Sequence, residues 1–257
     1  MPGESALIDL RGKRALVTGG SRGVGRATAR MLAAAGADVG IAYRSRSADA
    51  DATLAELRAA GVRAWAQPGD LSDERAVDVL FARVEREFGA LDLFIGNAGI
   101  WPHEDVPIAR MDSAQWRRTL AVNLDAVFLT TRAAARVITD DGRIVLVGST
   151  AGQRGEAGHA DYAASKGAII SLVKGVAIEL AARRITVNCV APGWIDTEMA
   201  AAPYVGDGRA RIEVAIPLGR VASAEDVAGP IVFLCSELAR HITGEVLNVN
   251  GGSVLCG

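Results

Sequence analysis

The sequence has few cysteines, few aromatic residues and no long hydrophobic run, and each scarcity excludes a class of protein. Its three cysteines are too scattered for a disulfide framework or a zinc site, and we expect free, mostly buried thiols in a reducing cytosol at Cys189, Cys235 and Cys256. No apolar run reaches the length of a membrane span, and residues 1–14 hold no apolar segment of signal-peptide length. We therefore expect a cytoplasmic protein that neither enters a membrane nor carries a cleaved leader.

The sequence also lacks an excess of charge of either sign. The 28 basic and 30 acidic residues give a net charge of -2, which offers no argument for a nucleic-acid partner. The three histidines, His103, His159 and His241, have neither metal-ligand spacing nor a nucleophile beside them, so we expect no metal site.

What the sequence does have is a regular alternation of β-rich apolar runs and helical patterns. The runs are Ala15–Thr18, Asp38–Tyr43, Val62–Ala66, Leu91–Ile95, Ile144–Gly148, Thr186–Val190 and Val246–Val249. The helical patterns are Gly23–Ala35, Ala48–Ala60, Asp73–Phe88, Ser113–Ile138, Tyr162–Ala182 and Ala224–Cys235. Such alternation gives right-handed crossovers and a parallel sheet. It predicts one α/β domain over residues 1–257: a Rossmann-type, doubly wound parallel sheet of about seven strands with helices on both faces.

The most informative pair of residues is Tyr162 and Lys166, four positions apart, with Ser149 thirteen residues upstream of Tyr162. Residues at i and i+4 share one face of a helix, so an ammonium is held beside a phenol and should lower its pKa. Ser149 could polarise a substrate oxygen at the same point. Alone, the pair also fits a helix with a surface tyrosine and a solvated lysine.

A glycine-rich turn follows the first apolar run. Gly19, Gly23 and Gly25 lie between that run and the first helical pattern, which is the arrangement of a phosphate cradle. Their spacing is not the dinucleotide fingerprint G-x-G-x-x-G, so the turn alone also fits an ordinary glycine turn.

Together these motifs resemble the short-chain dehydrogenase/reductase family over nearly the whole chain. The resemblance also rests on Asp70-Leu71, Asn97-Ala98-Gly99, Pro192-Gly193, Thr243-Gly244 and Asn250-Gly251-Gly252. One departure is Gly96, where many relatives have a second asparagine. The resemblance implies a catalytic tetrad of Asn123, Ser149, Tyr162 and Lys166. It also implies that the cofactor is bound by Gly19, Ser21, Arg22, Gly23, Val24, Gly25, Arg44, Asp70, Leu71, Asn97, Ala98, Gly99, Tyr162, Lys166, Pro192, Gly193, Ile195 and Thr197.

The end of the second predicted strand indicates whether the cofactor is NAD(H) or NADP(H). An NAD enzyme usually places an acid there for the ribose 2′-hydroxyl, whereas this chain has Arg44. Arg22 and Arg44 could converge on a 2′-phosphate, which a guanidinium binds through two donors. We therefore expect NADP(H) in preference to NAD(H), with Arg46 simply solvated.

The expected reaction interconverts a carbonyl and an alcohol by hydride transfer. Tyr162 would donate the proton, Lys166 would tune it, and Ser149 would stabilise the developing alkoxide. By resemblance, Asn123 would position a water in a relay to Lys166. We expect segment 195–221 to form a mobile lid over the substrate. Candidate pocket walls follow the strands that end at the site: Trp101, Gln153, Arg154, Trp194 and Tyr204.

The substrate is less determined. The nearest resemblance is to bacterial 3-oxoacyl-carrier-protein reductases, which dock an acidic carrier on basic residues. Arg183 matches one such position, but the other is Asp140, with Asp141 beside it. Like charges weaken docking. A small ketone or secondary alcohol is therefore favoured, with a 3-oxoacyl-carrier-protein reductase as the alternative. A non-catalytic NADP-binding regulator is a remote third possibility, because it would not need the tetrad. Relatives of this type also imply a homotetramer, or a homodimer.

Overall fold

The computed structural model describes residues 7–255 and contains a parallel sheet in which the strand order differs from the chain order. Seven strands lie in the order β3-β2-β1-β4-β5-β6-β7. They are β1 (Arg14–Thr18), β2 (Asp38–Tyr43), β3 (Ala64–Pro68), β4 (Leu91–Gly96), β5 (Ile138–Val147), β6 (Thr186–Pro192) and β7 (Val246–Val249). Because the order reverses between β1 and β4, ligands are expected beyond the carboxyl ends of these two strands.

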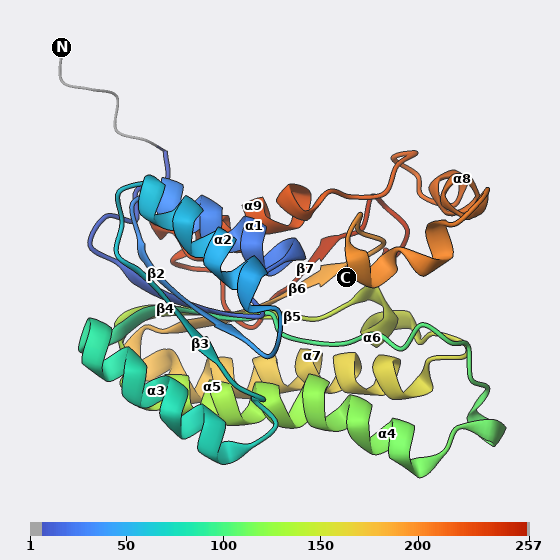
Figure 1. The fold of residues 1–257 in the computed structure, drawn as a ribbon, viewed down its shortest axis with the longest axis horizontal. Helices are drawn as coiled ribbons and strands as arrows, with labels where there is room; N and C mark the ends of the chain where they lie inside the picture. Colours follow the sequence, from blue (N-terminus) through green and yellow to red (C-terminus); the bar gives the residue numbers. More distant parts are fainter. Residues whose placement is uncertain (1–6, 256–257) are drawn as a thin grey trace.

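Helices cover both faces of the sheet (Figure 1). One face carries α1 (Gly23–Ala34), α2 (Ser47–Ala59) and α9 (Ala224–Leu234). The other carries α3 (Glu74–Phe88), α4 (Ser113–Leu120), α5 (Ala126–Val137) and α7 (Ala160–Leu180). The predicted fold class is confirmed. Shorter pieces are α6 (Thr150–Arg154), α8 (Gly208–Val214) and the helical turns η1 (Ile108–Arg110), η2 (Ala121–Asp125), η3 (Ala181–Arg183), η4 (Glu198–Ala200), η5 (Ala202–Tyr204) and η6 (Glu237–Ala239).

Polar residues fix where the long helices begin. The carboxylate of Asp73 accepts from the Arg75 amide at the start of α3, and Asp112 accepts from the Gln115 amide at 2.7 Å before α4. Ser223 and Asp226 form a reciprocal capping box at α9.

The sheet divides the core into two apolar layers. Every residue of β4 and of β6 is buried, as expected of central strands covered on both faces. Cys189 and Cys235 are free and buried, whereas Cys256 lies outside the described residues.

Three predicted boundaries were wrong. The strand expected at Ile144–Gly148 begins six residues earlier, because Ile138 already pairs with Leu91 of β4. The helix expected over Ser113–Ile138 is interrupted by the π-helical turn η2. The strand expected at Val62–Ala66 begins two residues later, because the Arg63 amide donates to the Asp38 carboxylate at 2.8 Å rather than continuing the sheet.

Candidate active site

The four predicted catalytic residues come from three elements that meet beyond the carboxyl end of β5. Ser149 follows that strand directly and caps α6, where its hydroxyl accepts from the Ala151 amide at 3.1 Å. Tyr162 and Lys166 lie on the first turns of α7, and Asn123 lies in η2. The fold therefore brings together groups that are up to 43 positions apart in the chain, from Asn123 to Lys166.

The Ser149 hydroxyl lies close enough to the Tyr162 phenol to lower its pKa. Burial raises the pKa of Tyr162 to about 12, which outweighs the lowering by Ser149, and the charge of Glu156 raises it further. The expected lowering of this pKa by Lys166 is therefore not found. The phenol is a neutral proton donor over the physiological range.

Lys166 is buried, with its ammonium donating to the Val147 carbonyl oxygen at 2.8 Å. Its nitrogen lies 5.8 Å from the centre of the Tyr162 ring. Burial lowers the pKa of Lys166 to about 8, because the charged form loses hydration.

Asn123 is completely buried, and its amide is occupied by protein groups. Its oxygen accepts from the Ile100 amide at 2.8 Å, and its nitrogen donates to the Ile100 carbonyl at 2.9 Å and to the Ser165 hydroxyl at 3.2 Å. Asn123 thus fixes the loop after β4 against α7. A Cβ added at Gly99 would lie 3.2 Å from the Asn123 oxygen and 3.5 Å from the Lys166 nitrogen, so the loop approaches both residues closely.

One continuous cleft runs from the glycine turn to Tyr162. Most predicted cofactor residues line it: Gly19, Ser21, Arg22, Gly23, Val24, Arg44, Asp70, Leu71, Asn97, Ala98, Gly99, Tyr162, Lys166, Pro192, Gly193, Ile195 and Thr197. Gly25 does not line the cleft. A Cβ there would lie 2.2 Å from the Gly19 carbonyl oxygen, so Gly25 lets α1 pack against the turn. The glycine cradle and the arginines beside it fit a dinucleotide phosphate.

The loop after β4 is tied to the end of β1. The Asn97 side chain donates to the Thr18 carbonyl oxygen at 2.9 Å, and the Ala98 amide donates to the Thr18 hydroxyl at 3.0 Å. A Cβ at Gly96 would lie 2.6 Å from a methyl carbon of Leu146. Glycine therefore suits a position where many relatives have asparagine.

The arginines expected to bind a 2′-phosphate have carboxylate partners in the structure. Arg22 and Arg46 both contact Glu198, at 2.8 and 3.0 Å, and Arg44 lies 3.9 Å from Asp70. The expectation that Arg46 is merely solvated was wrong, because it shares Glu198 with the glycine turn.

Three of the predicted substrate residues, Trp101, Arg154 and Trp194, line the cleft. Trp101 and Trp194 are perpendicular, with ring centres 6.0 Å apart. Tyr204 packs on Trp194 at 6.0 Å and donates to the Ile195 carbonyl at 2.9 Å, so it supports the wall rather than forming it. Gln153 is a correction: within the described chain it is not among the residues that line the cleft, because its amide donates to Asn248 at 2.7 Å.

Two residues beside the site were not assigned to it from the sequence. Glu156 lines the cleft beside Trp101, and burial raises the pKa of its carboxyl. His159 is buried and stacks on Trp101 with ring centres 4.6 Å apart. Their position in the loop before Tyr162 was the only signal in the sequence.

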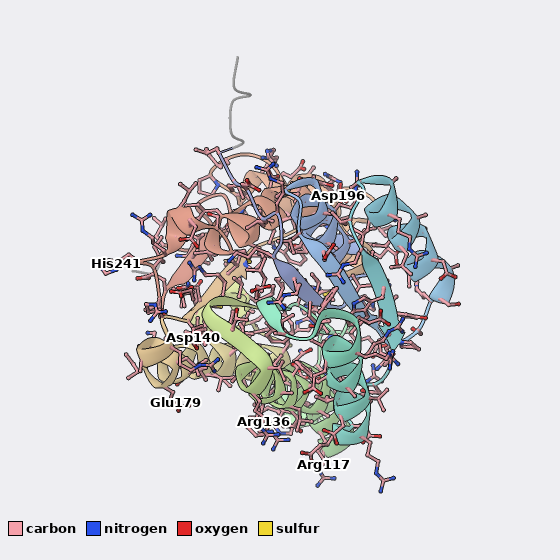
Figure 2. The ribbon with its side chains drawn as sticks, turned by 90° about the vertical axis from the view of Figure 1, so that its left-hand side faces the viewer. Arg117, Arg136, Asp140, Glu179, Asp196 and His241 are labelled. Atoms are coloured by element: carbon pink, nitrogen blue, oxygen red, sulfur yellow. The ribbon has the colours of Figure 1, made fainter. Side chains whose placement is uncertain are left out.

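Asp140 and Asp141 lie far from this cleft. They are near the amino end of β5, on the side of the molecule that faces the viewer in Figure 2 and is opposite α8 in Figure 1. Asp140 pairs with Arg183 at 2.9 Å, and Asp141 pairs with Arg184 at 2.7 Å. The two acids therefore neutralise the two arginines.

The described residues contain no group of three or more potential metal ligands and no helix long and apolar enough to span a bilayer.

Comparison with known proteins identifies the family of the chain. The family described as "Enoyl-(Acyl carrier protein) reductase" matches residues 19–253. The 3-oxoacyl-[acyl-carrier-protein] reductase FabG of Escherichia coli is 39% identical over 248 residues, covering 95% of this chain and 98% of the relative.

Solved structures give the same result. A short-chain dehydrogenase/reductase from Serratia marcescens superposes with a TM-score of 0.90 at 37% identity, covering 95% of this chain and 98% of that one. A short-chain dehydrogenase from Burkholderia cenocepacia in complex with NADP gives a TM-score of 0.90 at 41% identity, with the same coverage of 95% and 98%. The chain therefore belongs to the short-chain dehydrogenase/reductase family of oxidoreductases.

Proposed function

We propose that the protein is an NADPH-dependent carbonyl reductase. The observation that carries the proposal is the pair of Ser149 and Tyr162, which shares one cleft with Lys166 and the glycine turn. When bound, the nicotinamide supplies the hydride. A non-catalytic regulator would have no use for this pair.

The roles of the protein's own groups follow from their surroundings. Tyr162 is a neutral phenol and donates the proton to the carbonyl oxygen. Ser149 donates a hydrogen bond to the same oxygen as negative charge develops on it. Lys166 supplies a buried positive charge close to both, and Asn123 keeps the loop after β4 in place. As in other members of the family, Asn123 would also position a water in a proton relay to Lys166.

Arg22 and Arg44 support the choice of NADP(H) over NAD(H). Both line the cleft at the end where the glycine turn meets β2. A similar protein from Burkholderia cenocepacia was solved in complex with NADP, which agrees with this choice.

A 3-oxoacyl thioester is the first candidate substrate. Relatives that share about two-fifths of their residues with this chain, over nearly its full length, are named 3-oxoacyl-[acyl-carrier-protein] reductases. Such a substrate presents its ketone to Tyr162 and Ser149 like any other carbonyl compound.

A small free ketone is the second candidate, and a specific observation favours it. Arg183, which matches a carrier-docking position of those relatives, is paired with Asp140. Arg183 is also remote from the catalytic residues: it follows Lys166 by 17 residues, which is roughly 25 Å along a helix axis. An acidic carrier would meet little net positive charge there. The cleft also offers the indole rings of Trp101 and Trp194 as apolar walls.

The experiment that separates the two compares kcat/KM for a carrier-linked 3-oxoacyl group, a short 3-oxoacyl thioester without carrier, and a panel of small ketones. A preference of more than about tenfold for the carrier-linked form, roughly 1.4 kcal/mol, supports carrier docking. Equal rates for both thioesters exclude it. No NADPH-dependent reduction of any compound would contradict the proposed activity.

Three further features belong to the proposal. Segment 195–221, which contains η4, η5 and α8, would act as a mobile lid over the cleft. The protein would form a homotetramer, and it would work in the cytoplasm on small-molecule substrates. The assembly is tested below.

A further inference from the structure

The carboxylate of Glu198 bridges two arginines from distant parts of the chain. One oxygen of Glu198 lies 2.8 Å from Arg22, in the glycine turn, and 3.0 Å from Arg46, directly before α2. Glu198 belongs to η4, inside the expected lid, and is 176 positions from Arg22. The contact therefore joins the lid to the wall of the cleft.

The other acids near these arginines belong to that wall. Arg44 is 3.9 Å from Asp70, and Arg46 is 3.7 Å from Asp49, the acid in the first turn of α2. Asp49 and Asp70 lie outside segment 195–221, so a movement of the lid would not carry them away from the arginines. Glu198 is the acid that the lid itself carries to these arginines.

A carboxylate and a phosphate bind a guanidinium through the same donors. A 2′-phosphate held by Arg22 must therefore compete with Glu198. The side chains of Arg22, Arg46 and Glu198 are half-exposed, at 50%, 53% and 57%, so each ion pair is weak enough for a phosphate to displace it. NAD(H) has a 2′-hydroxyl in place of the phosphate, so its binding does not require Glu198 to leave Arg22.

We infer that Glu198 is a specificity-determining residue: it competes with the cofactor 2′-phosphate for Arg22, with Arg46 holding Glu198 in place, and so couples NADP(H) binding to the position of the lid. The inference rests on the proposed binding of NADP(H).

Neighbouring contacts explain how displacing one side chain would reach the rest of the lid. A Cβ added at Gly23 would lie 3.4 Å from the Thr197 methyl carbon, so the residue before Glu198 packs over the glycine turn. On the other side, Asp196 pairs with Arg209 of α8 at 2.8 Å. Glu198 thus sits where η4 meets the cofactor wall, with α8 tied to the same short stretch.

The test compares binding of NADPH and NADH by wild type and by Glu198→Gln, using fluorescence titration. The substitution keeps the shape of the side chain and removes its charge. NADPH should bind about three- to tenfold more tightly to the variant, the value of two exposed ion pairs, while NADH changes by less than about twofold. Asp207→Asn is the matched control, because Asp207 is an exposed lid acid that pairs with Arg211 at 3.0 Å.

A second measurement follows the lid without turnover. Limited trypsin digestion at Arg209 and Arg211 is compared with adenosine 2′,5′-bisphosphate, with adenosine 5′-phosphate and with neither. In wild type, only the 2′-phosphorylated probe should accelerate cleavage. In Glu198→Gln, cleavage should already be fast and should no longer depend on the 2′-phosphate.

The outcomes separate this inference from the proposed function. If wild type binds NADH more tightly than NADPH, the proposed cofactor is wrong and the inference falls with it. If wild type prefers NADPH but Glu198→Gln shifts neither the ratio of the two dissociation constants nor the digestion, the inference alone is overturned. A shift of equal size in the ratio of dissociation constants in Asp207→Asn would also overturn it, because the effect would then be one of general charge.

Discussion

Lys166 holds its ammonium 5.8 Å from the centre of the Tyr162 ring, while it donates to the Val147 carbonyl at 2.8 Å. Lys166 is buried and Tyr162 is partly buried, and loss of hydration moves their pKa values in opposite directions: that of Lys166 falls to about 8 and that of Tyr162 rises to about 12. Both shifts are toward the neutral form, yet at pH 7 the Lys166 ammonium still predominates. The pair is therefore poised with a protonated phenol, as reduction of a carbonyl requires.

Tyr162→Phe should remove the proton donor while keeping the ring. We expect carbonyl reduction to fall by about 10²–10⁴-fold, the usual value of a positioned acid. NADPH binding should change by less than about twofold, because the ring and Lys166 remain. Steady-state rates and a fluorescence titration measure the two quantities. Near-normal turnover would show that another group donates the proton.

The pH dependence of reduction should follow Lys166. Its ammonium is present below a pKa of about 8 and is lost as pH rises through that value. Tyr162, with a pKa of about 12, stays protonated across the same range and adds no inflection. The value of kcat/KM for ketone reduction should therefore decline as the pH rises through about 8.

Lys166→Arg tests the assignment of that decline. A guanidinium stays charged throughout the range, so the variant should be slower but its rate should lose the inflection near pH 8. An unchanged inflection in the variant would place the titrating group elsewhere.

Arg44→Asp should reverse the cofactor preference. The new carboxylate, beside Asp70, would repel a 2′-phosphate, and it could accept a hydrogen bond from a 2′-hydroxyl. We expect the ratio of kcat/KM for NADPH to that for NADH to fall by at least about tenfold. Arg58→Asp makes the same charge change at an exposed position of α2 outside the cleft and should leave the ratio unaltered. A wild type that already prefers NADH would refute the assignment of Arg44.

The fold could be predicted because its signals are local and repeated. Apolar runs, glycine turns and capping residues such as Asp73 and Asp112 each appear within a few positions of the element that they define. The π-helical turn at Asn123 could not be found this way. It is held by bonds from Asn123 to Ile100 and Ser165, and no local pattern announces contacts over such distances.

The candidate site likewise has parts that the sequence predicts and parts that it does not. Tyr162, Lys166 and the glycine turn lie in short motifs, whereas ion pairs between distant segments depend on the completed fold. Glu198 contacts Arg22 across 176 positions of sequence, and no local pattern predicts that contact. Asp140 and Arg183 likewise looked like competing surface charges in the sequence but are partners in space.

Gly96 offers a test of packing beside the site. A Cβ there would press on a methyl carbon of Leu146, a completely buried residue of β5. We expect Gly96→Ala to destabilise the protein by about 1–3 kcal/mol, the usual cost of overpacking. In a Leu146→Ala background the same change should cost much less, because the colliding group is gone. Chemical denaturation of the four proteins measures the coupling, and simple additivity would contradict the packing argument.

Assembly is the last prediction, and it rests on apolar side chains left exposed on two helices of one face. Phe128 of α5 is 47% exposed, and Ile178 of α7 is 78% exposed. Both helices cover the lower face of the sheet in Figure 1, where a second copy could pair with them. Burying such groups against a partner recovers the hydrophobic free energy that exposure forfeits.

We therefore expect a homotetramer by light scattering at micromolar concentration. Ile178→Arg should weaken it, because a charge would have to be buried in the apolar interface between copies. Val214→Arg is the matched control, since Val214 is equally apolar and exposed but lies on α8 in the lid. A monomeric wild type would refute the assembly. A tetramer that Ile178→Arg leaves intact would show that copies associate through another surface, with the short strand β7 at the edge of the sheet as the next place to substitute.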